Sequence, residues 1–287
     1  MRILIIGNTS ALGRRLWNSL SNNENEVYLA GRSDNPDIYL DLSFPDFNFE
    51  KLPESIDVII HCAASFKGNS IDEALENELI NSLGTYKVLK IAEKTNCKHI
   101  IYISSLSIYD HIENDYFGSY GLSKRHGQEN LKHYCSISGI MFTALMVSQI
   151  YDEKSQFLKH QGMLYRIIEK AYLGQDIDIY GNKDPLRNYL HVIDLINIIS
   201  SIISFKLQGE FNCLFPRSYK LSEIGTIALS IFNKGGKVNF LRDKADIGSI
   251  YIPDDGSLYS YINKPTIDLE QGIRMLKKEY EAREGRS

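Results

Sequence analysis

The sequence has few cysteines and no long apolar run, and these two shortages exclude several classes of protein. Its cysteines form no C-x-x-C pair and have no histidine at zinc-finger spacing, which argues against a disulfide framework and a zinc site; they are Cys62, Cys97, Cys135 and Cys213. Scattered thiols are typical of a reducing compartment. No stretch approaches the roughly 18 apolar residues that a membrane helix needs, and the apolar run at residues 3–6 is too short for the core of a signal peptide. We therefore expect a cytoplasmic protein without a membrane segment.

Glycine, proline and excess charge of one sign are also scarce. Twenty glycines and seven prolines among 287 residues are too few for a collagen-like or low-complexity chain. The 32 basic and 36 acidic residues give a net charge of −4, so we expect no nucleic-acid partner. A content of 43% hydrophobic and 24% charged residues is typical of a folded chain with a sizeable core, in one large or two modest domains.

The first half of the chain alternates short apolar runs with amphipathic stretches. The runs predict strands that are buried on both faces, and they occupy residues 2–6, 26–30, 57–62, 99–103 and 141–147. Between the first two runs, Leu12, Leu16 and Leu20 recur at the spacing of one helix face. Strands that alternate with helices predict an α/β fold, a doubly wound parallel sheet of the Rossmann type with helices on both faces.

After Tyr151 the alternation changes. The pattern there predicts a helix over residues 163–173, a strand over 176–180, a buried helix over 194–205 and a charged tail, 277–287, that frays. We expect a first domain over residues 1–150 and a small interleaved α/β cap over 151–287, with about 187–215 returning to the first domain.

The first predicted strand runs into a glycine-containing loop and then a helix. Gly7 permits a tight turn, and Gly13 lets the helix pack close to the sheet. The helix N-terminus, formed by Ser10, Ala11 and Leu12, offers free N–H groups to a pyrophosphate. Ser10 replaces the middle glycine of the usual pattern, but its side chain is small. The segment predicts a dinucleotide site, with a purely structural turn as the alternative.

Residues after the second predicted strand bear on which dinucleotide binds. Arg32 stands where an acidic residue would bind the adenosine ribose of NAD, and its guanidinium suits a 2′-phosphate instead. This favours NADP over NAD, unless Arg32 is an ordinary surface residue. Asp41 and Leu42 are expected near the adenine, although aspartate is also common in turns.

A tyrosine and a lysine at i and i+4 suggest proton chemistry. Tyr120 and Lys124 share one face of a predicted helix, where the ammonium would lower the pKa of the phenol from its ordinary value near 10. Ser105 follows a predicted strand, at the edge of a parallel sheet where ligands bind, and can hold a substrate oxygen. A turn serine and common helix residues are the alternative to this catalytic interpretation.

With these motifs the chain resembles the extended short-chain dehydrogenase/reductase family, of the NAD-dependent epimerase/dehydratase type. The resemblance covers about residues 2–275. It rests on seven motifs in order: Gly7…Gly13, His61-Cys62-Ala63-Ala64, Asn81…Gly84-Thr85, Ser104-Ser105…Tyr109, Tyr120…Lys124, Ser148-Gln149-Ile150-Tyr151 and Arg187-Asn188-Tyr189-Leu190-His191-Val192…Asp194.

The resemblance implies roles for the matching residues. Ser105, Tyr120 and Lys124 match the catalytic residues, and cofactor contacts are implied at Ala63, Ala64 and Val147 in addition to those above. Substrate contacts are implied at Ser105, Ser107, Gln149 and Arg187. Of these, Arg187 would grip the diphosphate of a nucleotide sugar unless it forms a surface salt bridge. The family also implies a homodimer. The histidines show no metal-ligand spacing, so we expect no metal.

The chain departs from the family near one strand end. Met146 and Val147 replace a frequent Arg-Pro, Gln149 replaces asparagine, and Asp152 replaces glycine. These departures bear on how the substrate is placed.

The residues around Ser105 limit which of the family's reactions we expect. A 4,6-dehydratase would carry Asp-Glu where Leu106 and Ser107 stand, and a GDP-fucose epimerase/reductase would carry cysteine in place of Ser107. The resemblance then implies an NADPH-dependent reductase of a 4-keto-6-deoxy nucleotide sugar, in the synthesis of bacterial surface-polysaccharide sugars. A nucleotide-sugar 4-epimerase with bound NAD, a reductase of non-nucleotide carbonyl compounds and a non-catalytic NADP-binding sensor or scaffold stay open as alternatives.

Overall fold

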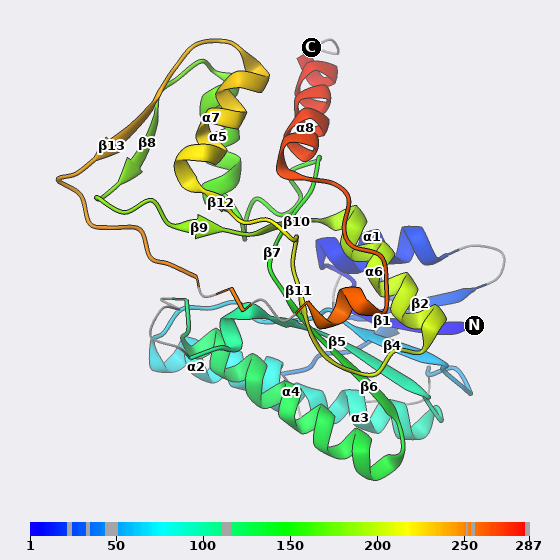
Figure 1. Cartoon of the computed structure of the whole chain (residues 1–287). Helices are drawn as coiled ribbons and strands as arrows, with labels where there is room; N and C mark the ends of the chain where they lie inside the picture. Colours follow the sequence, from blue (N-terminus) through cyan, green and yellow to red (C-terminus); the bar gives the residue numbers. More distant parts are fainter. Residues whose placement is uncertain are drawn as a thin grey trace.

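A computed structural model describes residues 1–21, 25–32, 35–43, 51–110, 116–250, 252–253 and 256–284. Its centre is a sheet of seven parallel strands (Figure 1). In order across the sheet these are β11 (Gly209–Cys213), β6 (Met141–Val147), β5 (His99–Ser105), β4 (Val58–His61), β1 (Arg2–Ile6), β2 (Glu26–Gly31) and β3 (Ile38–Tyr39). The strand order reverses between β1 and β4, at the switch point where such sheets bind ligands. The predicted doubly wound Rossmann-type sheet is confirmed.

The two faces of the sheet bury alternate residues, which explains why its strands are apolar throughout. Ile3 and Ile5 enter one hydrophobic core, whereas Leu4 and Ile6 enter the other. The first core is covered by α1 (Ala11–Leu20) and α6 (Val192–Phe205), and the second by α3 (Gly84–Lys94) and α4 (Ser119–Ser138) (Figure 1).

Between β4 and α3 the chain forms two short segments that the sequence pattern did not predict. The helix α2 (Ile71–Asn77) continues directly into a π-helical segment, Glu78–Leu83. The wider π-helical turns place Asn77 and Asn81 against the loop after β4 and against α4. Such segments are frequent near functional sites.

The C-terminal elements form a smaller layer beyond one end of the sheet (Figure 1). Their strands pair locally, β7 with β10 and β8 with β13 in parallel, and β9 with β12 antiparallel. The elements are β7 (Gln149–Tyr151), α5 (Gly162–Tyr172), β8 (Ile177–Tyr180), β9 (Leu186–Arg187), β10 (Tyr189–His191), β12 (Tyr219–Lys220), α7 (Leu221–Phe232), β13 (Val238–Leu241) and α8 (Leu269–Glu284). The expected fraying of the tail is wrong as far as the structure describes it, because 277–284 continue α8, which is anchored by buried Ile273 and Leu276.

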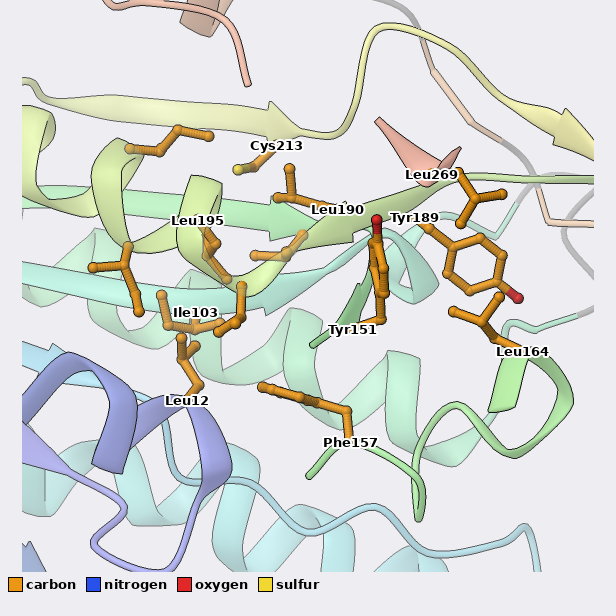
Figure 2. Packing of buried hydrophobic residues seen from close by; sticks show 14 of the residues in the cluster. Leu12, Ile103, Tyr151, Phe157, Leu164, Tyr189, Leu190, Leu195, Cys213 and Leu269 are labelled. Atoms are coloured by element: carbon orange, nitrogen blue, oxygen red, sulfur yellow. The ribbon is translucent and has the colours of Figure 1, made fainter. Parts of the chain in front are cut away.

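One hydrophobic core continues from the sheet into this layer. Leu12 of α1 and Ile103 of β5 belong to the same cluster as Leu164 of α5 and Leu269 of α8 (Figure 2). Tyr151 lies between the two groups, fully buried. The C-terminal layer is therefore packed on the core of the sheet rather than on a separate core of its own.

Candidate active site

The loop between β1 and α1 has the geometry that its glycines predict. Gly7 has φ +121°, and a Cβ there would lie 3.0 Å from the backbone nitrogen of Ala63. At Gly13 a Cβ would lie 2.4 Å from the carbonyl oxygen of Gly7. Neither position accepts a side chain, so the tight turn and the close approach of α1 both require glycine.

The N-terminus of α1 leaves backbone donors available. The Ser10 hydroxyl caps the helix by accepting from the Gly13 nitrogen at 3.4 Å. Within the described residues, the backbone N–H groups of Ala11 and Leu12 have no hydrogen-bond acceptor. The Leu12 side chain points into the core, so only its backbone faces outward (Figure 2). Two free N–H groups at a helix N-terminus fit a pyrophosphate.

The three residues expected near the adenosine are Arg32, Asp41 and Leu42. They follow β2 and β3, at the carboxyl ends of these strands. Arg32 is exposed directly after β2. One carboxylate oxygen of Asp41 accepts from the backbone nitrogen and hydroxyl of Ser43, at 2.9 and 2.6 Å. Leu42 is buried and packs against Gly84. Asp41 therefore shapes a turn, and only its other oxygen remains for a ligand.

Three side chains from β5 and α4 form the catalytic candidate. Ser105 ends β5, and Tyr120 lies in the first turn of α4, within hydrogen-bonding reach of the Ser105 hydroxyl. Lys124 is almost fully buried one turn later, and its Nζ donates to the Ile103 carbonyl at 2.6 Å. The structure thus brings together the three residues that the sequence singled out.

Two glycines let α4 approach closely enough to place these groups. A Cβ at Gly121 would lie 2.0 Å from the carbonyl oxygen of Ser107, and a Cβ at Gly127 would lie 2.0 Å from that of Asn81. The helix backbone therefore contacts both segments directly. This contact fixes Tyr120 and Lys124 against the end of β5.

The electrostatics of this trio differ from the sequence-based expectation. Burial raises the pKa of Tyr120 to about 12, and the hydrogen bond with Ser105 offsets only part of that rise. Burial also lowers the pKa of Lys124 to about 7, while its Nζ lies 4.0 Å from the centre of the Tyr102 ring. The expected lowering of the Tyr120 pKa by Lys124 is therefore wrong for the protein groups alone, and Tyr120 holds its proton at neutral pH.

The other predicted cofactor contacts lie beside this trio. Ala63 and Ala64 follow β4, and Ala63 contacts the Gly7 turn. Val147 ends β6 and is the register partner of Ser105. All three positions therefore lie at the carboxyl edge of the sheet, where the first loop and the catalytic trio also lie.

Arg187 has an unusual environment for a cation. It is completely buried, and no described carboxylate pairs with it. Its guanidinium donates to the carbonyls of Leu186 and Gly248 and to the Tyr116 hydroxyl, and Nε has no partner. A buried arginine without a counterion fits an anionic ligand better than the surface salt bridge considered from the sequence.

The remaining predicted substrate residues occupy separate segments. Ser107 lies half-buried in the short 3₁₀ helix Leu106–Ile108, and its backbone nitrogen donates to the Ser105 hydroxyl at 3.1 Å. Gln149 starts β7, and its amide donates to Gln161 at 2.9 Å. No hydrogen bond joins Ser107 to Gln149 in the described part of the molecule.

Sequence reasoning missed an aromatic neighbour of Tyr120 and a second ring that packs on that neighbour. The Phe66 ring lies edge-on to Tyr120 with centroids 4.6 Å apart, and the His160 ring lies edge-on to Phe66 at 5.6 Å. Phe66 comes from the loop after β4 and His160 from the loop after β7. Isolated aromatic and histidine residues in loops gave no sequence signal that they meet here.

A search for other site chemistry is negative within the described residues. They contain no group of three or more histidine, cysteine, aspartate and glutamate side chains placed to hold a metal ion. None of their helices is both long and apolar enough to cross a membrane.

Comparison with known proteins agrees with this geometry. The model of the NAD dependent epimerase/dehydratase family matches residues 3–213. The chain is 26% identical to the putative UDP-glucose 4-epimerase of Methanocaldococcus jannaschii, over 95% of this chain and 96% of that one. It is 21% identical to dTDP-4-dehydro-6-deoxy-D-allose reductase of a Streptomyces species, over 66% of this chain and 64% of that one.

The fold is likewise similar to solved structures. The structure of RMD from Pseudomonas aeruginosa, complexed with NADPH, superimposes with a TM-score of 0.79 over 98% of this chain and 99% of that one, at 17% identity. From the motifs, the fold and the matching family model together, the chain belongs to the NAD-dependent epimerase/dehydratase family, the extended short-chain dehydrogenase/reductases, and is an enzyme.

Proposed function

We propose that the protein reduces a 4-keto-6-deoxy nucleotide sugar with NADPH. The observation that carries this proposal is the placement of Tyr120 beside Ser105 at the carboxyl end of β5, where burial also raises the pKa of the phenol. Reduction of a ketone needs a proton donor beside the developing alkoxide, and a protonated tyrosine next to a serine hydroxyl supplies one. Oxidation of an alcohol would instead need the phenolate.

Ser105, Tyr120 and Lys124 each have a separate role in the proposed reduction. When bound, the reduced nicotinamide supplies the hydride that adds to the keto carbon. The Ser105 hydroxyl holds the substrate oxygen, and Tyr120 gives its proton to that oxygen as negative charge develops. Lys124 lies beneath the site as a buried group that can bind the nicotinamide ribose and return a proton toward Tyr120.

The residues around the first loop fit a dinucleotide with a 2′-phosphate. Gly7 and Gly13 form a cradle that a Cβ would fill, and the free N–H groups of Ala11 and Leu12 face the pyrophosphate position. Arg32 would bind the 2′-phosphate, and its exposed position directly after β2 supports NADP over NAD. Ala63, Ala64 and Val147 would line the nicotinamide half, and Asp41 and Leu42 the adenine.

The proposal that the substrate is a nucleotide sugar rests on Arg187. A completely buried guanidinium without a described carboxylate partner suits a diphosphate. We assign residues 1–150, with 187–215, to the cofactor-binding part and the rest to the substrate-binding cap. Gln149 and Ser107 would contact the sugar. The product class, deoxy sugars on a nucleoside diphosphate, suits surface-polysaccharide synthesis.

We also propose a homodimer formed by α3 and α4. Five apolar or aromatic side chains on these helices and the adjoining π-helical segment are more than a third exposed: Leu83, Tyr86, Leu122, Tyr134 and Ile137. The rings of Tyr86 and Tyr134 pack edge-on at 5.6 Å, which links the two helices into one surface. An apolar surface of this kind suits a second copy of the chain.

The four free thiols suit the cytoplasm.

A nucleotide-sugar 4-epimerase is the second candidate. It is favoured by the similarity to a putative UDP-glucose 4-epimerase over nearly the whole chain. An epimerase would oxidise and then reduce its substrate with the same tightly held cofactor, so it would consume none.

A panel of substrates separates the two candidates. CDP-, dTDP-, UDP- and GDP-linked 4-keto-6-deoxy sugars are each supplied with NADPH or NADH, and UDP-glucose is supplied without added cofactor. The proposal predicts NADPH consumption with a keto sugar and no conversion of UDP-glucose, and loss of turnover but not of NADPH binding in Tyr120→Phe. Interconversion of UDP-glucose and UDP-galactose would support the epimerase.

A further inference from the structure

The loop after β4 presents an aromatic ring at the catalytic tyrosine. Phe66 is 57% exposed although its ring lies only 4.6 Å, centre to centre, from that of Tyr120. A single exposed phenylalanine is ordinary on a protein surface. This one differs because it adjoins the group that transfers the proton.

Two buried asparagines hold the backbone on either side of Phe66. Asn81 accepts from the Ser65 nitrogen at 2.7 Å and donates to the Ser65 carbonyl at 2.8 Å. Asn77 makes the same pair of bonds with Lys67, at 3.1 and 3.4 Å. Each residue adjacent to Phe66 is thus clamped by one amide side chain.

The same asparagines also reach the catalytic helix. Asn77 donates to the Ser119 hydroxyl at 2.9 Å, and Asn81 donates to the Ser123 hydroxyl at 3.0 Å. These two serines lie on either side of Tyr120 in the sequence. The two asparagines therefore fix Phe66 and Tyr120 relative to each other, although both rings remain partly open to solvent.

The ring of His160 lies against Phe66 and comes from a different segment of the chain. It lies in the loop between β7 and α5, with its exposed ring edge-on to Phe66 at 5.6 Å. Its neighbour Gln161 accepts a hydrogen bond from Gln149, one of the residues proposed to contact the sugar. Desolvation and the nearby charge of Lys159 lower the pKa of His160.

We infer that Phe66 and His160 form an aromatic wall of the sugar site, which packs against the C5 substituent beside the reacting carbon and selects a methyl group over a carboxylate. The inference rests on the proposed function, because it takes C4 as the carbon held at Tyr120. C4 is flanked by C3, which carries a hydroxyl group, and by C5, and of these two positions a methyl group at C5 is the substituent that suits an apolar ring beside Tyr120.

The chemistry of the wall sets the direction of selection. The Phe66 ring offers favourable contact to a methyl group, whereas it has no hydrogen-bond donor for a carboxylate that would lose hydration beside it. The cation next in sequence, Lys67, is already paired with Glu76 at 3.4 Å. The wall therefore strengthens the binding of a 6-deoxy sugar and weakens the binding of a uronic acid.

Binding of a matched ligand series tests this inference. Calorimetric titrations with NADP present compare dTDP, dTDP-6-deoxyglucose and dTDP-glucuronate, and the corresponding UDP series runs in parallel. The wild-type protein should bind the 6-deoxy sugar about tenfold or more tightly than the uronate. Phe66→Ala should weaken binding of the 6-deoxy sugar about fivefold and leave binding of the nucleoside diphosphate within about twofold.

Three further variants test whether the loss of affinity is specific to the aromatic wall. Phe66→Leu keeps apolar bulk and should lose less affinity than Phe66→Ala, whereas His160→Ala should lose affinity for the sugar only. Phe205→Ala removes a similarly exposed phenylalanine at the end of α6 and should change nothing.

Three results would overturn the inference alone: equal losses for the nucleoside diphosphate and its 6-deoxy sugar, no loss in Phe66→Ala, or equal binding of the uronate by the wild type. Failure of dTDP, UDP, CDP and GDP alike to bind the wild type would overturn the proposed substrate class as well.

Discussion

Arg15, in the second turn of α1, donates to Asp152 at 3.1 Å across 137 residues of sequence. The Asp152 side chain is completely buried, and the same guanidinium donates to Glu153 at 2.7 Å. Asp152 stands where the family usually has glycine, so Arg15 supplies the cation that this departure needs. The pair also ties the cofactor helix to the start of the loop that carries His160.

Removing the Arg15 side chain should therefore destabilise the fold. Arg15→Ala leaves the Asp152 carboxylate buried without its cation, and we expect a loss of about 3 kcal/mol in the free energy of unfolding. Arg15→Lys should lose less. Urea denaturation measures both, with Arg166→Ala, an exposed arginine on α5, as a control that should change by less than about 0.5 kcal/mol. A loss in Arg15→Ala no larger than in the control would contradict this role.

Lys124 should make stability depend on pH in an unusual direction. Its pKa is about 7 in the folded protein and about 10.4 in an unfolded chain, so the unfolded chain binds more protons between these values. The free energy of unfolding contributed by this group therefore rises with pH from about 7 to 10. Below pH 7 the buried ammonium imposes its full cost.

Lys124→Met removes that cost together with the activity. The variant should gain stability relative to the wild type at low pH, and the difference in the free energy of unfolding should fall by about 4 kcal/mol from pH 6 to pH 10. Thermal and urea unfolding across this range measure it, with Lys278→Met, at an exposed lysine on α8, as a control. A difference that stays constant with pH would show that the Lys124 ammonium is not destabilised by burial.

Arg32 should decide between the two dinucleotides. Because a charge-assisted hydrogen bond to the 2′-phosphate is lost, Arg32→Ala should weaken NADPH binding about tenfold or more while leaving NADH binding nearly unchanged. Fluorescence titration of both cofactors with both proteins measures this. Tighter binding of NADH by the wild type, or equal losses for the two cofactors, would contradict the assignment.

The apolar surface of α3 and α4 should hold a dimer together. A double variant, Leu83→Glu with Ile137→Glu, places two carboxylates on that surface and should yield a folded monomer, because burying them in an interface is too costly. Sedimentation and light scattering report the mass. Phe205→Glu alters an equally exposed apolar residue elsewhere and should leave the dimer intact. A wild-type monomer at working concentrations would refute the proposal.

Local sequence pattern predicted the elements that form the cofactor-binding sheet. The continuous apolar run at residues 2–6 could only be a strand covered on both faces, and Gly7 and Gly13 sit where the backbone leaves no room for a Cβ. The spacing of Tyr120 and Lys124 likewise placed them on one helix face. These features follow from short-range geometry, which the sequence shows directly.

The features that were missed depend on distant partners. The pKa of Tyr120 rises because burial outweighs its neighbours, and burial depends on the packing of the whole site. Phe66 meets His160 only because separate loops converge. Arg15 in the first helix gave no sign that it would pair with Asp152.

A deuterium label tests the reductase proposal most directly. NADPH that carries deuterium at the transferable position is incubated with a dTDP-linked 4-keto-6-deoxy sugar, and the product is analysed by mass spectrometry and NMR. We predict one deuterium at C4 of the sugar for each NADPH consumed, with Tyr120→Phe giving none. Conversion of a UDP-sugar into its C4 epimer, with no NADPH consumed and no deuterium gained, would contradict the account.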